Sequence, residues 1–156
     1  LLEGQDKAFV SRQNVQVAGR MAALLSSFGV DSERKFLGLM PLGNSSHAHE
    51  YRLLFAAPEL DEQALEDWWV YACEAERELV KPDASHEFSI VSLILATGTV
   101  DKAVQKKLKK LTGGRDFSSM GRGWSSVRIA AVGLDEHKAY TNRMGDALKN
   151  ILKPIL

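Results

Sequence analysis

The sequence contains one cysteine, no net charge and no long apolar run, and each absence removes a class of protein. The lone thiol of Cys73 excludes an internal disulfide framework and a zinc site built from several cysteines. The 20 basic and 20 acidic side chains cancel, which argues against a strongly basic protein that coats DNA. No stretch approaches the roughly 18 consecutive apolar residues of a membrane span. We therefore expect a protein of the reducing cytoplasm that does not enter a membrane.

The remaining composition is that of an ordinary folded domain. The chain has 156 residues, of which 45% are hydrophobic and 26% charged. This length and balance allow most of the apolar surface to be buried in one core. We expect residues 1–156 to form a single globular domain, either complete or excised from a longer chain.

Apolar periodicity predicts two helices and a hairpin in the first half of the chain. Apolar residues recur at three- and four-residue steps between Asn14 and Phe28, which predicts a helix capped by Asn14 and stopped by Gly29. Two apolar runs at 35–42 and 49–56 flank a turn-rich segment at 43–46, which is typical of a hairpin with Pro41 at its end or edge. A second helix is expected from the N-cap Asp61 to about residue 79.

The second half favours alternating strands and helices. The run at 86–97 is the most continuously apolar in the chain, which predicts a central strand covered on both faces. A helix capped by Thr99 and a half-exposed strand at 124–132 follow. A terminal helix is expected from about Asn142, and the residues before it could close a short hairpin. The predicted order is α-β-β-α-β-α-β-α, a layered α+β or α/β domain with a mixed sheet of four to five strands packed against helices.

Opposite charges are concentrated in two segments. Residues 58–79 hold eight acids against Arg77 alone, and residues 101–128 hold eight bases against Asp101 and Asp116. Such a dipole could steer a partner, join copies head to tail, or reflect two adjacent helices of one molecule. The sequence leaves these three alternatives open.

The segment from the basic helix 102–110 through the Gly-Arg loop 113–124 is the leading candidate for ligand binding. Glycine-rich backbone and arginine can hold phosphate, and an exposed aromatic ring can stack on a base. The candidate residues for a phosphate ligand or nucleic acid are Lys106, Lys109, Lys110, Arg115, Arg122 and Trp124. The glycines follow a helix, unlike those of the known nucleotide motifs. The alternative is a helix stop, a flexible connection and a solvated lysine face.

Trp68 and Trp69 are adjacent on the acidic helix and therefore point about 100° apart. One ring could pack inward while the other forms a contact with a second copy or a partner protein, because tryptophan is prominent at interfaces. The equal alternative is that both rings pack within one wide apolar face.

No catalytic or metal-binding arrangement stands out. His47, His49 and His86 flank predicted strands but lack a third ligand fixed by spacing, so we expect neither a metal nor a cofactor. Ser118 and Ser119 lack the surroundings of a hydrolase nucleophile, and Cys73 is expected to be buried and inert. These absences favour a non-catalytic protein-interaction or regulatory domain. Nucleic-acid or phosphate-ligand binding is the alternative, and a small-molecule enzyme comes third.

Overall fold

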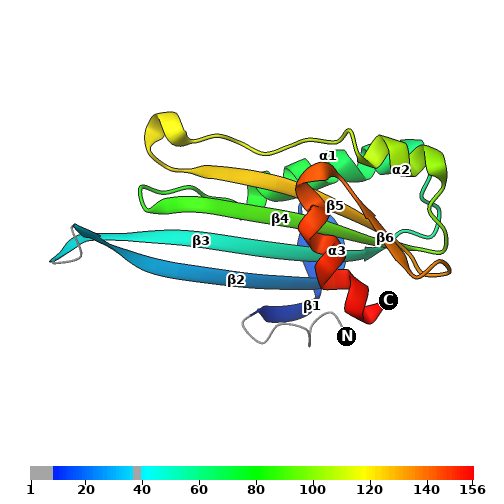
Figure 1. Ribbon diagram of the computed structural model, residues 1–156, viewed down its shortest axis with the longest axis horizontal. Helices are drawn as coiled ribbons and strands as arrows, with labels where there is room; N and C mark the ends of the chain where they lie inside the picture. The colour runs from blue at the N-terminus through cyan, green and yellow to red at the C-terminus, as the bar shows by residue number, and fades with distance from the viewer. Residues whose placement is uncertain (1–8, 37–39) are drawn as a thin grey trace.

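One mixed sheet of six strands organises the part of the chain that the structure describes (Figure 1). This computed structural model describes residues 9–36 and 40–156, and the side chains of residues 9–29 and 47–156. The strands are β1 (Val10–Val17), β2 (Arg20–Phe36), β3 (Met40–Ala56), β4 (His86–Thr97), β5 (Trp124–Gly133) and β6 (Lys138–Thr141). They lie side by side in chain order, with β3, β4 and β5 parallel and the other neighbours antiparallel.

Helices cover the two faces of the sheet unequally. Helix α1 (Glu62–Leu79) connects β3 to β4, and α2 (Lys102–Leu108) connects β4 to β5. Both pack on the same face, over the larger core that contains Leu93 and Ile129. Helix α3 (Asp146–Leu152) packs on the opposite face, over Ile94, Ala130 and Val132. In Figure 1, α3 crosses only part of that face, and no described helix lies over β2 to β5 beside it.

Several expectations are confirmed. The fold is α+β with one mixed sheet, and α1 begins where expected, because the side chain of Asp61 accepts the Ala64 N–H at 2.7 Å. The helix ends at Leu79, ahead of Pro82. Strand β4 covers the predicted range His86–Thr97 and is paired on both sides.

No helix among the described residues is long and apolar enough to cross a membrane.

The predicted first helix is wrong, because its residues form the β1–β2 hairpin. Ala18 and Gly19 have φ values of 48° and 82°, and they make the two-residue turn that joins Val17 to Arg20. Positive φ at both turn positions matches the twist of a hairpin. The apolar periodicity misled because Leu24 and Leu25 are adjacent in β2 and both are buried, one on each face of the sheet. Adjacent buried residues are also part of the apolar stripe of a helix. The proposed cap Asn14 and stop Gly29 both lie inside strands.

The predicted second hairpin is wrong. Residues 35–42, expected to be one strand, instead include the end of β2 at Phe36 and the start of β3 at Met40. Residues 49–56 are strand as expected, but the predicted loop at 43–46 is also part of β3. That segment pairs with β2, for example Ser45 with Glu33, so the ladder overrides the turn preference of its Gly, Asn and Ser residues. Pro41 pairs with Lys35 near the end of the ladder, as expected. The connection between the strands, residues 37–39, lies outside the described residues.

The second half differs in three details. Strand β5 is not half-exposed, because α1 and α2 cover one of its faces and α3 covers part of the other. Helix α2 begins after Asp101 rather than at Thr99, and it ends at Leu108. Both alternatives for the C-terminus hold, since β6 closes a hairpin with β5 and a helix follows. The observed order is β-β-β-α-β-α-β-β-α, with six strands instead of four to five.

Candidate functional site

The Gly-Arg loop forms an additional edge beside β5 (Figure 1, yellow-green to yellow). The backbone of residues 113–117 runs antiparallel to the start of this strand. The Ser125 N–H donates to the Arg115 carbonyl at 2.8 Å, and the Val127 N–H donates to the Gly113 carbonyl at 3.1 Å. The Phe117 N–H donates to the Gly123 carbonyl at 2.7 Å. The first part of the predicted loop is therefore fixed by hydrogen bonds to the sheet.

Three of the four loop glycines permit close packing. A Cβ atom at Gly114 would lie 2.3 Å from the Ser125 carbonyl oxygen, and one at Gly123 would lie 1.8 Å from the carbonyl oxygen of Glu87. At Gly113, a Cβ would meet the Trp69 ring at 2.8 Å. These positions require glycine because backbone or a large ring occupies the space of a side chain.

Arg115 is held by a buried carboxylate of α1. Its Nε lies 2.8 Å from Oε1 and 2.9 Å from Oε2 of Glu76, a residue that is 2% exposed. The Ser125 hydroxyl donates to the same carboxylate at 2.7 Å. The guanidinium also lies over the Phe117 ring, 4.8 Å from its centre. The charge of Arg115 is therefore compensated within the domain.

The other end of the loop is fixed by a buried histidine. The Nδ1 of His86 lies 2.5 Å from the Arg122 carbonyl oxygen, and its Nε2 lies 2.7 Å from the Ser89 hydroxyl. With Nδ1 donating and Nε2 accepting, one neutral tautomer satisfies both bonds. The Arg122 side chain is partly exposed and forms no ion pair with a described residue. His86 is thus structural, and no group of three possible metal ligands occurs in the described part of the chain.

The two oppositely charged helices face each other within one molecule. Lys107 of α2 forms an ion pair with Glu66 of α1. The candidate residues Lys106, Lys109 and Lys110 are exposed and, within the described regions, form no ion pair. Part of the charge separation read from the sequence is therefore internal, while these three lysines remain accessible.

Trp124 borders a cleft beside the start of β5. Its ring is 43% exposed and stacks on Phe88, with ring centres 5.1 Å apart and planes 15° apart. The cleft has a volume of about 810 Å³ and is lined by residues 112–116 together with Ser118, Trp124, Ser125 and Met144. Of the predicted ligand-binding residues, the structure brings Arg115 and Trp124 together here.

Trp68 and Trp69 both pack against the larger core. Trp68 contacts Phe55, with ring centres 4.9 Å apart, and the Arg20 guanidinium lies 4.3 Å from its ring. Trp69 packs against Gly113 of the loop. The two rings therefore share one wide apolar face, and both are partly exposed. Their role in an interface stays a prediction.

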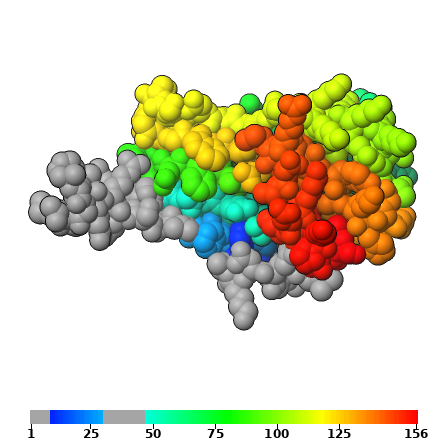
Figure 2. Space-filling view, viewed as in Figure 1, coloured from blue at the N-terminus to red at the C-terminus, as the bar shows by residue number. Residues whose placement is uncertain are grey.

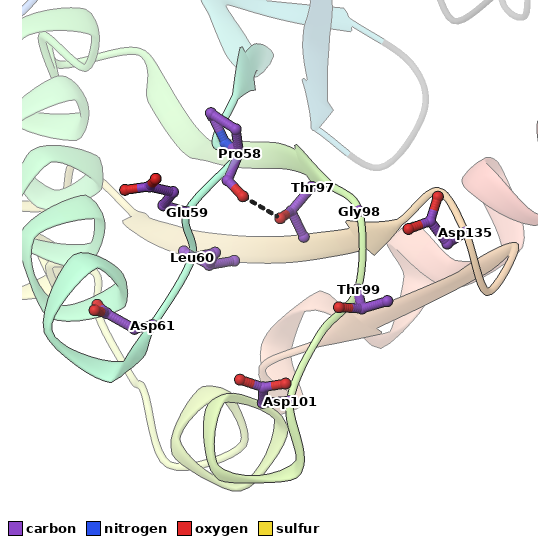
Figure 3. A pocket seen from close by; sticks show the side chains of 9 residues that line it. All are labelled: Pro58, Glu59, Leu60, Asp61, Thr97, Gly98, Thr99, Asp101 and Asp135. Carbon is purple, nitrogen blue, oxygen red and sulfur yellow. Dashed lines mark hydrogen bonds between the residues drawn. The ribbon is translucent and has the colours of Figure 1, made fainter.

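A second cleft lies where the chain leaves the carboxyl ends of β3 and β4 (Figure 3). It has a volume of about 350 Å³, and its lining includes the carboxylates Glu59, Asp61, Asp101 and Asp135. Asp61 caps α1, and the Thr97 hydroxyl is 3.5 Å from the Pro58 carbonyl oxygen. Glu59 and Asp61 belong to one segment, Asp101 and Asp135 to two others, and in Figure 3 the four carboxylates do not converge on one point.

The only cysteine lies on α1 beside the loop. Burial raises the pKa of the Cys73 thiol, and the side chain is half-buried next to Gly113. A raised pKa disfavours the thiolate at neutral pH and therefore lowers nucleophilic reactivity.

Sequence reasoning missed a polar row on the face that α3 partly covers. Cross-strand pairing places Ser26, Arg52, Ser92 and Arg128 side by side on β2, β3, β4 and β5. These residues are far apart in the chain, and only the strand register reveals that they are neighbours. A serine or arginine inside an otherwise apolar strand was the available signal.

Comparison with known proteins gives one family and no individual relative. Searches of curated proteins and of solved structures gave no match. A family model described as a domain of unknown function (DUF8052) matches residues 5–154. Because this match spans nearly the whole chain, the protein belongs to the DUF8052 family.

Proposed function

We propose that this is a non-catalytic interaction domain that binds an extended, acidic segment of a partner protein beside β5. The proposed binding surface, called here the Trp124 groove, consists of the edge segment 113–117 with Trp124 and Met144. The observation that carries the proposal is an edge of backbone next to exposed apolar side chains. A peptide strand can add to such an edge through main-chain hydrogen bonds.

The backbone of the edge segment supports this mode of binding. Gly113, Arg115 and Phe117 form main-chain hydrogen bonds with β5 or the residue before it. Gly114 and Asp116 alternate with them along the segment and are exposed. In an antiparallel arrangement, alternate residues direct their N–H and C=O groups to opposite sides. The outward groups of Gly114 and Asp116 are therefore available to an added strand.

The side chains next to this edge are typical of a protein-binding surface. Trp124 and Met144 are 43% and 49% exposed, and Met120 in the same loop is 60% exposed. Tryptophan and methionine are enriched where proteins meet, because they offer a large contact area or adapt their shape. A groove of about 810 Å³ is large enough to take several side chains of an extended peptide.

Charge at one end of the groove favours an acidic partner. The side chain of Asn142 donates to the Leu111 carbonyl at 3.1 Å, which places the end of α2 beside residues 142–144. The basic residues there, Lys109, Lys110 and Arg143, are exposed. Acidic residues in the partner would meet this end, which would increase the rate of association and fix the peptide direction.

Selection from a displayed peptide library, followed by anisotropy titration of the selected peptides, tests the proposal. We expect acid-rich peptides whose affinity falls at least tenfold in a W124A/M144A double variant. The V70A/M21A variant is a matched control, because both residues are 58% exposed but lie on α1 and β2. The proposal fails if no peptide is enriched, or if both variants bind equally well.

The second candidate is nucleic-acid or phosphate-ligand binding by the exposed lysines and Trp124. It is favoured by the stacking of Trp124 on Phe88, which leaves part of the indole free to contact a base. A mixed-sequence single-stranded oligonucleotide should then bind with an affinity that falls steeply as salt is added. A K109Q/K110Q variant should weaken that binding, and no binding at low salt would remove the candidate.

Self-association also stays a prediction, which light scattering at low and high salt can test.

A further inference from the structure

We propose a second binding site, for a phosphate group, on the sheet face beside α3, where Arg128 is partly exposed and two serine hydroxyls lie just beneath the surface. Its residues are Arg128 and Ser126 of β5 and Ser92 of β4. This site lies on the face of the sheet, not along its edge, and it does not depend on the Trp124 groove. Its donors have no acceptor in the part of the chain that the structure describes.

The three residues are neighbours by strand register. Ser92 pairs directly with Arg128, and Ser126 precedes Arg128 by two positions on the same strand. Residues directly opposite each other are separated by about 5 Å across a sheet, and residues two positions apart by about 7 Å along a strand. Side chains two positions apart point to the same face. The two hydroxyl groups and the guanidinium therefore share one small area.

None of these groups has a partner among the described residues. The Ser92 and Ser126 hydroxyls are buried, at 0% and 1% exposure, and form no hydrogen bond within that part of the chain. The Nε of Arg128 is buried and likewise lacks an acceptor. Within the described regions, Arg128 also forms no ion pair. Leaving buried polar groups unpaired is costly, and a buried charge without a counter-ion is more so.

Both residues in the other half of the same polar row have partners. The Ser26 hydroxyl is 2.7 Å from that of Ser11, and Arg52 forms an ion pair with Glu50 at 3.3 Å. The Phe9 ring lies over the Arg52 guanidinium at 4.0 Å. The protein thus completes its polar contacts across β1, β2 and β3 but not across β4 and β5. This contrast locates the site.

The donor set suits phosphate. Serine hydroxyls and a guanidinium offer donors from different directions, and arginine binds phosphate through parallel hydrogen bonds. The oxygen atoms of a phosphate are arranged tetrahedrally and can accept from donors in different directions, whereas those of a carboxylate lie in one plane. Figure 2 shows this face from the front, with β4 and β5 surfaces (green and yellow) beside α3. The phosphate can be a free ion or part of a larger ligand.

Calorimetric titration and thermal unfolding test the site with three probes at equal ionic strength: inorganic phosphate, glycerol 3-phosphate and acetate. We expect phosphate, its ester, or both to bind and to raise Tm, while acetate and added chloride do not. Tighter binding of the ester would identify a phosphorylated ligand, and tighter binding of the free ion would identify inorganic phosphate. Either result supports the site.

Two variants and a control complete the test. R128Q and, independently, S92A should each weaken phosphate binding at least tenfold, whereas R12Q, at an exposed arginine of β1, should not. S92A removes a hydroxyl without a partner and should fold normally. The proposal is overturned if neither phosphate probe binds, if acetate binds equally well, or if S92A and R128Q bind as the unaltered protein does.

A stability measurement separates a binding role from a structural one. In phosphate-free buffer, R128M should have a higher Tm than the unaltered protein, because an unpaired, partly buried charge is replaced by an apolar side chain of similar length. A clear decrease in Tm for R128M would show that the arginine stabilises the fold, and would overturn the proposal.

Discussion

The carboxylate of Glu76, in the last turn of α1, is bound by both the Nε and the Nη2 of Arg115, each at 2.8 Å from Oε1. This ion pair joins the outer helix to the edge segment 113–117, and the hydroxyl of Ser125 connects both to β5. The arginine that the sequence nominates for ligand binding is therefore also a structural contact. Removing this arginine should therefore lower the stability of the fold even when no ligand is present.

We expect R115A to destabilise the domain by about 3 kcal/mol, because Glu76 would remain buried without its counter-charge. Arg122 lies in the same loop but forms no ion pair with any described residue, so R122A should change the free energy of unfolding by less than about 0.5 kcal/mol. Urea unfolding of both variants gives the comparison. Equal stability of the two would show that the ion pair contributes nothing.

Asn142 fills a gap in the sheet edge between residue 113 and β6. Its side chain accepts the Ile129 N–H at 3.1 Å and donates to the carbonyl groups of Leu111 and Val127 at 3.1 and 3.3 Å. N142A should therefore lower the free energy of unfolding by about 3 kcal/mol, since three backbone groups at buried or partly buried hydrogen bonds lose a partner. N142D should also destabilise, because a carboxylate cannot donate to the two carbonyl groups.

The exposed Asn150 of α3 provides a matched control for this position. N150A should leave the unfolding midpoint nearly unchanged, as is usual for a surface substitution. If N142A were as well tolerated as N150A, the bridging role of Asn142 would be wrong.

Alanine substitutions at two loop glycines distinguish the cost of steric crowding from the cost of a left-handed backbone conformation. Gly121 and Gly123 have similar positive φ values, 66° and 74°. A Cβ at Gly121 would meet nothing within 4 Å, whereas one at Gly123 would lie 1.8 Å from the Glu87 carbonyl oxygen. G121A should cost about 1–2 kcal/mol, the usual cost of a left-handed conformation. G123A should cost clearly more, because backbone must move; thermal unfolding of the two variants decides this.

The hydrogen bonds of Glu136 predict how the stability of the domain depends on pH. Its carboxylate accepts the Val100 N–H at 2.8 Å and the Tyr140 hydroxyl at 2.7 Å, and these bonds lower the pKa of Glu136. A pKa that is lower in the folded state means that the stabilisation is complete above the unfolded-state pKa. It is lost as the pH falls through the folded-state pKa.

Urea midpoints measured from neutral to acidic pH test this dependence. E136Q should show a smaller loss of stability on acidification than the unaltered protein, because it lacks the titrating group. E74Q, at an exposed position of α1, is the control and should retain the original dependence. Parallel curves for E136Q and the unaltered protein would contradict the prediction.

Local signals predicted part of the fold correctly. The Asp61 cap, the end of α1 before Pro82 and the continuous apolar run of β4 each depend on residues close together in the chain. The segment 14–28 failed for the opposite reason. Its apolar spacing fits a helix face, but pairing with β3 turned Leu24 and Leu25 into a strand buried on both sides.

The candidate site, too, could be predicted only in part from the sequence. The sequence by itself proposed the loop 113–124, Trp124 and the neighbouring lysines as candidates, because glycine, arginine and tryptophan have strong individual preferences. Only the tertiary structure assigned Arg115 to Glu76 and placed Gly123 against Glu87. Only strand register brought Ser92 beside Arg128. Composition and local pattern determine where the chain can bend or be buried, whereas contacts between distant segments decide which polar groups are satisfied and which remain free to bind a ligand.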